Sequence, residues 1–461
     1  MRKPRLGLLG LMAGTYEPIF PGIIERQENY ARELVKTFSA VADIDFPGAA
    51  TNREMIGQRV RYFNEKQLDG ILIVLLTYSQ GTWLLQPLLE NRLPLALAVI
   101  QPDSYVDEEF YELDLTVNQG IHGAQDNSNM IVRNGIKCQF FAAERNDPAL
   151  VKFVADFGHA AMTYKEMRGM KVGVLSRMQG MGDILLDDMA YSARIGAEFC
   201  NDTAGSIYRR MEALTKAEID DQIAKDHETF VIDPKLTYES HAEAVRMYLA
   251  FKKWLIDNDF KAFTAHFDIF GDDGRFHQLP LYAASQLMAD GYGYAAEGDQ
   301  SCAAMVMAAH LLGEGGGNFT EMYMMDFKVN GICFCHAGEG NWATSEKKPR
   351  LIDRYLGEGG LENPPTIMFV PKAGRATLTS LAPMNGDYMR LLVAGGEMLP
   401  KDDLKNCEMP YFFWRPDSGV TTCVKNWLAN GGTHHEVINL GDVSDRWKML
   451  CDLWDIEFVQ V

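Results

Sequence analysis

Three short apolar runs stand near the start of the chain, with helix-like segments between them. They cover residues 5–12 (RLGLLGLM), 71–77 (ILIVLLT) and 94–100 (PLALAVI). Each run is continuously apolar, which is typical of parallel strands buried on both faces. The charged segment from about Pro21 to Phe38 fits a helix that crosses between two such strands. The pattern predicts a doubly wound α/β domain over residues 1–169.

A second series of the same kind begins near Met170. KVGVLS, GAEFC, ETFVID and AFTAHF are predicted strands, and helical segments such as HAEAVRMYLAFKKWLIDN lie between them. This series predicts a second Rossmann-like α/β domain over residues 170–318.

The pattern changes after about Asn318. MMDFKVNGICFCHAG, PTIMFVP and RATLTSLAPMNGDYMRLLVAGGEML look like strands joined by short turns, and Asn385–Gly386 is a strong hairpin signal. Residues 319–461 are therefore predicted to form an antiparallel, β-barrel-like domain. The fold class is α/β, with two doubly wound domains followed by this C-terminal domain.

The stretch GYGYAAEGD at residues 291–299 holds the first candidate for chemistry. Pro280 opens a helical segment, Gly291 closes it, and a short strand leads to Glu297 before a second apolar helix begins at Asp299. Glu297 thus lies at a strand-to-helix turn, where open α/β sheets bind their ligands. The alternative is that Glu297 only favours the helix N-terminus through the helix dipole.

Other polar residues later in the chain are candidates to join Glu297. They are Glu321 in NFTEMY, His336 in CFCHAGEGNW and the pair His434–His435 in NGGTHHEV. Two carboxylates with one or two imidazoles suit a Mn²⁺, Co²⁺ or Mg²⁺-like ion better than a thiolate site does. Taken singly, each is also explained as a surface carboxylate, a core histidine or a polar loop.

Composition narrows the class of protein. The 461 residues carry a net charge of −19, so the chain offers no basic surface for nucleic acid. No stretch approaches the length of a membrane span, and the apolar N-terminal run is interpreted as a first buried strand rather than a signal peptide. The eight scattered cysteines are most simply explained as free thiols in a reducing cytoplasm. We therefore expect a cytoplasmic, multidomain protein.

Two motifs resemble the L-arabinose isomerases of the arabinose/fucose isomerase superfamily. HQLPLYAASQLMADGYGYAAEGD is similar to their central-domain signature, and ANGGTHHEV is similar to their double-histidine motif; WDIEFVQV resembles their closing strand. The resemblance implies a metal-dependent aldose–ketose isomerase, which moves a proton between two adjacent carbons of a sugar. It implies that Glu297 and Glu321 are metal ligands and the acid/base pair, that His336 and His435 are metal ligands, and that His434 faces the sugar.

The same resemblance implies further substrate contacts and an assembly. Gln119 and His122 match a segment that reaches the sugar in a neighbouring subunit's site, which implies a homo-oligomer, trimeric or hexameric, with active sites at subunit contacts. Met181 lies in the loop 178–182 that corresponds to a methionine-bearing substrate loop. Phe267 resembles the family's aromatic residue at the sugar, and Phe270 is its rival for that role.

The sequence departs from the family's pattern at two places in the substrate half of the site and at one place beside the metal ligands. GLMAGTYE, which contains Met12, replaces the usual glutamine-bearing loop, and Tyr78 replaces an apolar aromatic residue. Glu339 adds a carboxylate after His336, either as support for that histidine or as a lone surface charge. Arg177 would meet an anionic substituent or form a surface salt bridge. A deoxy- or sulfosugar isomerase and a non-catalytic sugar-binding protein are therefore the alternatives.

Overall fold

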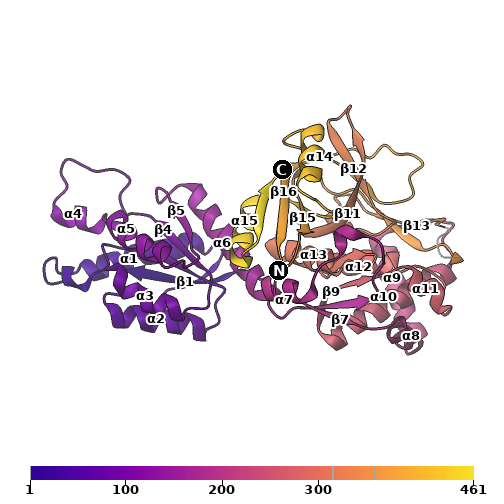
Figure 1. Cartoon of the computed structure of the whole chain (residues 1–461), viewed down its shortest axis with the longest axis horizontal. Helices are drawn as coiled ribbons and strands as arrows, with labels where there is room; N and C mark the ends of the chain where they lie inside the picture. The colour runs from indigo at the N-terminus through magenta and orange to yellow at the C-terminus, as the bar shows by residue number, and fades with distance from the viewer. Residues whose placement is uncertain (1, 314–315, 357–359) are drawn as a thin grey trace. The chain divides into compact units, whose positions relative to one another are not determined.

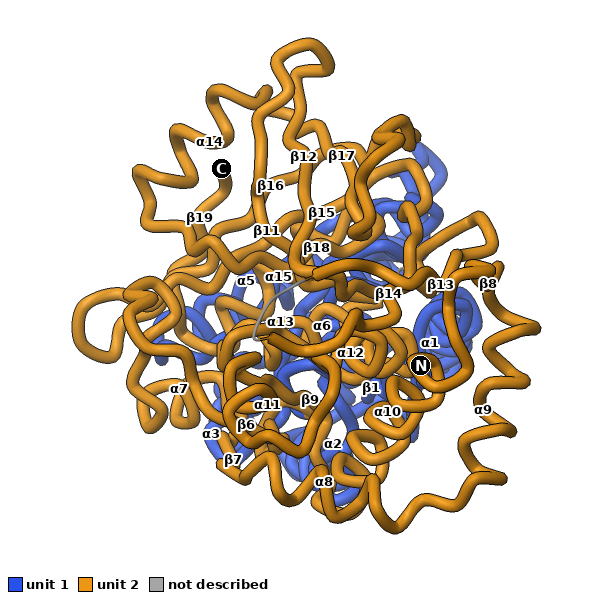
Figure 2. The backbone as a smooth tube through the Cα atoms, turned by 90° about the vertical axis from the view of Figure 1, so that its right-hand side faces the viewer, with its two compact units in different colours: residues 1–165 blue, residues 166–461 orange. Residues whose placement is uncertain are grey.

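The computed structural model describes residues 2–313, 316–356 and 360–461. The chain divides into two compact units, residues 1–165 and 166–461 (Figure 2). Among the helices of these described ranges, we find none that combines the length and the hydropathy needed to cross a membrane. All eight cysteines are free.

Unit 1 is built on a five-stranded parallel sheet. Its strand order is β2-β1-β3-β4-β5, so the chain winds outward from β1 in both directions. The strands are β1 (Arg5–Leu11), β2 (Asp43–Asp45), β3 (Gly70–Leu75), β4 (Leu95–Val99) and β5 (Gln139–Ala142). The helices are η1 (Gly14–Tyr16), α1 (Ile23–Phe38), α2 (Arg53–Glu65), α3 (Gly81–Glu90), α4 (Glu112–Val117), α5 (Gly120–Arg133) and α6 (Pro148–Met167). The doubly wound prediction is confirmed, and every residue of β3 is buried, as its continuous apolarity indicated.

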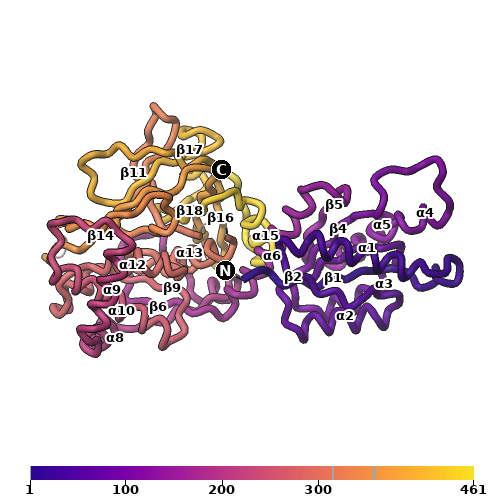
Figure 3. The backbone as a smooth tube through the Cα atoms, turned by 180° about the vertical axis from the view of Figure 1, so that it is seen from behind, coloured from indigo at the N-terminus to yellow at the C-terminus, as the bar shows by residue number. Residues whose placement is uncertain are grey.

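Unit 2 begins with a four-stranded parallel sheet of order β10-β9-β6-β7. The strands are β6 (Lys171–Leu175), β7 (Glu198–Asn201), β9 (Phe260–Ala265) and β10 (Gly293–Ala296). The helices are η2 (Gly182–Ile184), α7 (Asp188–Arg194), α8 (Ala204–Glu212), α9 (Lys216–Thr229), α10 (Tyr238–Asn258), α11 (Asp268–Asp273), α12 (Leu281–Ala289) and α13 (Gln300–Leu312). The long helix α10 packs against α8, α9, α12 and β9 (Figure 3).

The predicted strand ETFVID does not belong to this parallel sheet. Only Val231–Ile232 is extended, as β8, and it pairs with β13 (Arg350–Asp353), which in turn pairs with β14 (Pro365–Met368). Val231 is 51% exposed. A strand this short and this exposed lacks the buried faces that a central parallel strand needs, so its membership in the central series was predicted wrongly.

The rest of unit 2 forms a closed barrel of six antiparallel strands. Their order is β15-β18-β11-β12-β17-β16, and pairing of β16 with β15 closes the ring; β19 joins β16 from outside. The strands are β11 (Gly317–Asp326), β12 (Gly331–Cys335), β15 (Gly374–Pro383), β16 (Met389–Leu399), β17 (Tyr411–Pro416), β18 (His435–Leu440) and β19 (Glu457–Gln460); η3 (Trp342–Thr344), α14 (Val420–Ala429) and α15 (Ser444–Trp454) complete the unit. Both the barrel and the hairpin at Asn385–Gly386, between β15 and β16, are confirmed.

Helix α13 lies between the parallel sheet and the barrel of unit 2. It is buried on nearly all sides, because it packs against β9 and β10 on one side and against β11 and β18 on the other (Figure 1). The turn before α13 therefore lies next to the barrel strands β11 and β18. This packing brings Glu297 close to the residues that the barrel contributes.

Candidate metal centre

Two neighbouring barrel strands and the end of a third bring three of the candidate residues together. Glu321 on β11 pairs directly with His435 on β18 and, on its other side, with Cys335 on β12. His336 follows Cys335. Cross-strand partners in an antiparallel sheet have side chains about 5 Å apart, so this register brings Glu321 and His435 together. His336 lies one residue beyond the end of β12, and its Nε2 is 3.5 Å from Oε1 of Glu321. Together with Glu297, the three residues offer ligand atoms that all lie within 4.8 Å of one another.

Glu297 lies close to these three residues and belongs to the turn between β10 and α13. Its φ of +62° lies in the left-handed region, which is uncommon for a residue with a side chain. The carbonyl of Glu297 accepts a 2.9 Å hydrogen bond from the amide of Met178, and Asp299 caps α13 by accepting from the amide of Cys302 at 2.9 Å. These two bonds hold the turn in its unusual conformation.

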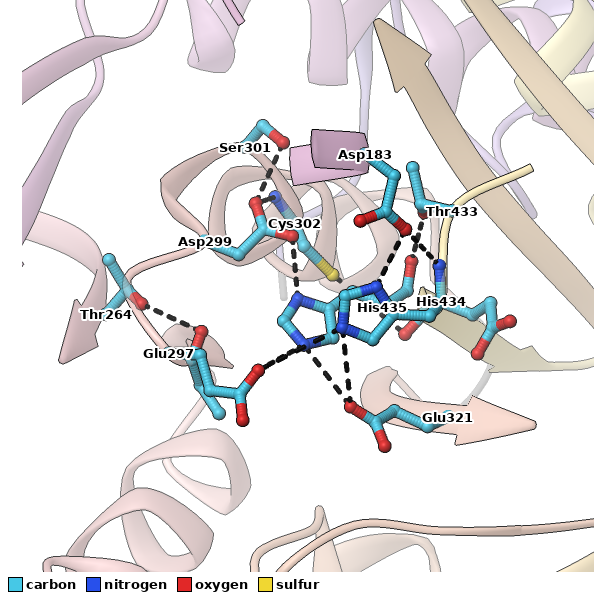
Figure 4. A network of polar contacts seen from close by, with 12 residues as sticks. Asp183, Thr264, Glu297, Asp299, Ser301, Cys302, Glu321, Thr433, His434 and His435 are labelled. Atoms are coloured by element: carbon cyan, nitrogen blue, oxygen red, sulfur yellow. Dashed lines mark hydrogen bonds and ion pairs between the residues drawn. The ribbon is translucent and has the colours of Figure 1, made fainter. Parts of the chain in front are cut away.

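His435 is oriented by a carboxylate on each side. Its Nδ1 lies 2.9 Å from Oδ2 of Asp299, while its Nε2 faces Glu297 at 3.2 Å and Glu321 at 3.3 Å (Figure 4). The imidazole is completely buried. Asp299 therefore leaves Nε2 as the nitrogen directed into the site.

His336 has a matching arrangement. Its Nδ1 lies 3.1 Å from Oε2 of Glu339, and its Nε2 lies 3.5 Å from Oε1 of Glu321. The hydroxyl of Tyr294 donates a 2.7 Å hydrogen bond to the other oxygen of Glu339. Because Glu339 is buried beside His336, its carboxylate is not a lone surface charge.

His434 lies beside His435 but is about 40% exposed (Figure 4). Asp183 in η2 accepts hydrogen bonds from its backbone amide at 2.9 Å and pairs with its Nδ1 at 2.7 Å. Its Nε2 lies 4.0 Å from both Glu297 and Glu321. His434 thus stands at the rim of the four-residue group.

The carboxylates and histidines shift each other's ionisation. Burial alone lowers the pKa of His435, but the three carboxylates around it outweigh burial and raise the pKa well above the usual value. Burial likewise lowers the pKa of His336, but Glu339 and Glu321 together raise it above the usual value. Burial raises the pKa of Glu297, whereas its hydrogen bonds to His434 and His435 bring it below the usual range. The group therefore favours charged carboxylates and protonated histidines when no cation is bound.

The donor set fits a divalent cation. Both buried histidines engage a carboxylate through Nδ1 and direct Nε2 toward Glu297 or Glu321. Two carboxylates and two imidazoles without thiolate are ligands that suit Mn²⁺ or Co²⁺. A cation would also replace the protons as the positive charge between the carboxylates.

A cavity of about 160 Å³ adjoins these residues. Apolar side chains form much of its wall, and they include both rival aromatic residues, half-buried Phe267 and fully buried Phe270. Glu297, Glu321 and His336 line the same cavity. The cavity is therefore open to the candidate ligands and has the apolar wall typical of small-molecule sites.

Four of the other predicted substrate residues lie in unit 1. The rings of Tyr78 and His122 stack with centroids 4.7 Å apart, and the Tyr78 hydroxyl donates to Asp126 at 2.9 Å. Gln119 precedes α5, and Met12 is fully buried at the end of β1.

The remaining residues of the substrate half lie in unit 2. Met181 is half-buried and precedes η2. Arg177 forms a salt bridge with Asp188 at 2.5 Å. Of the two alternatives for Arg177, the structure therefore shows the salt bridge rather than a free side chain for an anionic substituent.

Comparison with known proteins assigns the family. Residues 187–315 match the family model of the L-arabinose isomerase central domain, and residues 316–457 match that of the L-arabinose isomerase C-terminal domain. The chain is a divergent L-arabinose isomerase-like protein. The matched residues include all four members of the candidate metal centre.

Relatives of this arabinose isomerase-like protein are distant in sequence. The L-arabinose isomerase of Clostridium beijerinckii is 26% identical over 380 residues, covering 81% of this chain and 76% of its own. That of Geobacillus kaustophilus is 24% identical over 454 residues, covering 95% and 91%. A solved solute-binding protein from Actinobacillus succinogenes with bound D-allose is 11% identical, and the match covers 67% of this chain and 90% of that one. Its TM-score of 0.17 is too low to indicate a shared fold.

Three residues of the site were not predicted from the sequence as site residues. Asp299 was recognised only as the start of a helix, whereas its second carboxylate oxygen contacts His435. Tyr294, on β10, bonds Glu339, and Asp183 bonds His434. The spacing Glu297-x-Asp299 was the available signal for Asp299. No local pattern pointed to the other two, because their partners lie far away in the sequence.

Proposed function

We propose that this protein is a metal-dependent aldose–ketose isomerase, with Glu297, Glu321, His336 and His435 as ligands of a Mn²⁺ ion; Co²⁺ or Mg²⁺ is the alternative ion. The observation that carries the proposal is the convergence of these four side chains within 4.8 Å in a chain of the L-arabinose isomerase type. The relatives named above are themselves L-arabinose isomerases.

The reaction moves a proton between two adjacent carbons of a sugar through a cis-enediol. A bound divalent ion would supply electrostatic stabilisation of the negative charge that develops on the substrate oxygens. Glu297 and Glu321 act as the acid/base pair, because both carboxylates line the cavity next to the ligand nitrogens. Glu297 is ionised at neutral pH, since its histidine partners lower its pKa, so its carboxylate is in the form that a cation binds.

The neighbouring residues position the ligands and the sugar. Asp299 and Glu339 fix the ring orientation of His435 and His336, so that Nε2 of each ring remains available. His434, held by Asp183, faces the sugar at the exposed side of the site. Phe267 and Met181 complete the substrate contacts of this unit.

The decisive experiment combines metal analysis with activity. Purified protein should bind Mn²⁺, lose activity with a chelator and recover it with Mn²⁺ or Co²⁺, when tested on aldose–ketose pairs of pentoses, hexoses, deoxysugars and sulfosugars. Glu297→Gln and Glu321→Gln should each lower kcat by about a hundredfold to ten-thousandfold without unfolding the protein. A fully active metal-free preparation, or wild-type turnover in either variant, would contradict the proposal.

We further propose that the chain works as a homo-oligomer, trimeric or hexameric, in which Gln119 and His122 of one subunit serve the site of another. This follows from the family resemblance. Large apolar side chains exposed on and just after β11 favour a contact with a second copy: Tyr323 is 54%, Met324 69% and Phe327 69% exposed. Light scattering that gives the mass of a monomer would contradict the proposal.

A further inference from the structure

A buried carboxylate, Asp226, lies outside the metal centre. It is 1% exposed on α9, and its Oδ2 lies 2.8 Å from Nε2 of buried His241 on α10 and accepts a 2.5 Å hydrogen bond from the hydroxyl of Tyr282 on α12. Its Oδ1 accepts from Gln222 at 2.9 Å and from Gln286 at 3.2 Å. The carboxylate is therefore saturated with partners from three helices.

This network continues from α12 to the segment after the proposed metal ligand His336. Gln286 donates through Nε2 to the hydroxyl of Tyr282 at 2.7 Å, and its Oε1 accepts a 2.9 Å hydrogen bond from Nε1 of Trp342. The Trp342 ring also meets Phe230, at the end of α9, edge-to-face at 5.1 Å. Trp342 is thus tied twice to the elements that hold Asp226.

The segment 336–341 contains neither helix nor strand, so side chains must fix its position. On α12, Ser285 accepts a 3.1 Å hydrogen bond from the amide of Gly340. Arg354 donates to the carbonyl of Ala337, and Asn318 accepts from the amide of Asn341. Glu339 lies between these anchoring points, and His336 directly precedes the first of them. Their placement therefore depends on α12 as much as on the barrel.

Stability alone does not explain a charged group at Asp226. Burying a carboxylate costs several kcal/mol unless it is fully paired, and apolar packing is often at least as stable as a buried ionic network. Such groups have in some proteins the effect of specifying one geometry. In this protein the network ends at Trp342, so the geometry that it would specify is that of the adjacent segment, which contains His336.

We propose that Asp226 is a positioning residue for His336 and Glu339 and acts through Gln286 and Trp342. The inference rests on the proposed function, because it assumes that His336 binds the metal. Removing the network would let the segment 336–342 shift, so that Nε2 of His336 moves away from the other three groups that would hold the ion. Metal affinity and the ligand field should change without the loss of any ligand.

Trp342→Phe provides the cleanest test, because it removes the Nε1 donor and keeps an aromatic ring against Phe230. We expect its Kd for Mn²⁺ to rise about threefold to tenfold, less than for loss of a direct partner of a ligand. The visible absorption band of the Co²⁺-loaded protein should also shift, which a change in stability alone would not cause. Asp226→Asn should produce an effect at least as large.

Asp69→Asn is the matched control. Asp69 is fully buried and multiply bonded, to Arg2 at 2.6 Å and to the amide of Arg5 at 2.8 Å, but it belongs to unit 1. Its variant should lower thermal stability while the Kd for Mn²⁺ stays within about twofold and the Co²⁺ spectrum is unchanged. This control distinguishes a loss of thermal stability in general from a change in metal binding caused by displacement of His336.

The outcomes are distinct. If Trp342→Phe and Asp226→Asn both retain the wild-type Kd and the wild-type Co²⁺ spectrum, the positioning role is wrong, whatever their thermal stability. If Asp226→Asn does not fold, Trp342→Phe and Gln286→Met decide the question by the same two measurements. If the wild-type protein itself binds neither ion, the proposed function fails and the positioning role fails with it.

Discussion

Each of the three histidines at the site has a carboxylate at its Nδ1 atom. Asp299 serves His435, Glu339 lies against His336, and Asp183 serves His434. A carboxylate in this position fixes the ring and keeps the proton on Nδ1, so that Nε2 is the free nitrogen. The two fully enclosed histidines are the ones whose Nε2 lies closest to Glu321. Burial and the distance from Nε2 to Glu321, rather than the carboxylate at Nδ1, therefore distinguish the two proposed ligand histidines from the rim histidine.

Asp299→Asn tests this pairing without removing the helix cap. Asparagine caps a helix as well as aspartate does, so α13 should remain intact. Its amide nitrogen, however, would face the proton on Nδ1 of His435. We expect the Kd for Mn²⁺ to rise about tenfold to a hundredfold, with little change in thermal midpoint. Isothermal titration and calorimetry would check the two effects, and a normal Kd would contradict the role of Asp299.

The raised histidine pKa values predict opposite pH trends for metal-free and metal-loaded protein. A raised pKa of His336 or His435 adds stability that is fully present below the usual value of 6.5 and disappears as pH rises through the folded value. The lowered pKa of Glu297 adds stability above its usual 4.5 that is lost as pH falls through the folded value. Without metal, this group should stabilise the protein most between about pH 4.5 and 6.5.

Metal binding should show the reverse trend, because the ligand histidines must lose their protons. We expect the Kd for Mn²⁺ to decrease steadily from pH 6 to pH 8.5, and binding to release protons. Titrations in two buffers of different ionisation enthalpy would count those protons. A Kd that is constant over this range would show that the histidines are neutral before the ion binds.

Sequence and resemblance together named the four central residues, but not the groups that orient them. Glu297 and His435 were found because each lies in a long motif. Tyr294 and Asp183 contact Glu339 and His434 through tertiary packing, which leaves no periodic signal in the chain. The hydroxyl of Tyr78 illustrates the same limit, since its partner Asp126 depends on how α5 packs.

At the scale of elements, the turn from β10 to α13 depends on a glycine. Gly298 has a φ of +82°, and a Cβ atom there would lie 2.4 Å from Cα of Arg177. Because the obstacle is backbone, a side chain at this position would push the loop after β6 away from Glu297.

Gly298→Ala should therefore lower both thermal stability and metal affinity. Gly169→Ala is the control, because Gly169 has a φ of +79° and nothing within 4 Å of an added Cβ. Both variants carry the strain of a left-handed residue, about 1–2 kcal/mol, and only Gly298→Ala adds the clash. Equal thermal midpoints for the two variants would mean that the close approach to Arg177 is unimportant.

The elements themselves were largely predictable, with one instructive exception. Continuous apolar runs identified the parallel strands, and Asn385–Gly386 identified the hairpin between β15 and β16. The prediction for residues 228–233 was wrong because a short apolar run has the same sequence pattern whichever strand it pairs with. Only the tertiary structure shows that β8 pairs with β13.

At the scale of the whole molecule, the parallel sheets and the barrel could be predicted from the sequence, but the packing of the elements between them could not. Helix α13 was predicted as apolar, yet only its packing against β9, β10, β11 and β18 explains why it is apolar on every side. The closure of the barrel through β15 and β16 likewise follows from no single segment. Long-range pairings of this kind depend on the whole chain.

Assembly gives the last test, because the proposal divides one active site between two subunits. His122→Ala affects unit 1 and leaves the four-ligand group intact, whereas Glu297→Gln affects that group alone. When the two variants are co-expressed with different tags and mixed oligomers are isolated through both tags, some sites combine an intact unit 2 with an intact neighbouring unit 1. Random assembly, followed by selection through both tags, predicts about a quarter of the sites in a hexamer and about a third of those in a trimer to be of this kind.

We therefore expect the mixed oligomers to recover up to about a quarter of wild-type kcat as hexamers, or about a third as trimers, with wild-type KM at those sites. Glu297→Gln co-expressed with Glu321→Gln is the control, because each of its sites retains one defect in the ligand group and should stay inactive. All the variants are single substitutions at polar positions, so we expect similar expression levels for both co-expressed combinations. A difference in activity between the two combinations then reports on the shared active site. Activity in the mixed oligomers that does not exceed that control would show that His122 serves its own chain or no site at all.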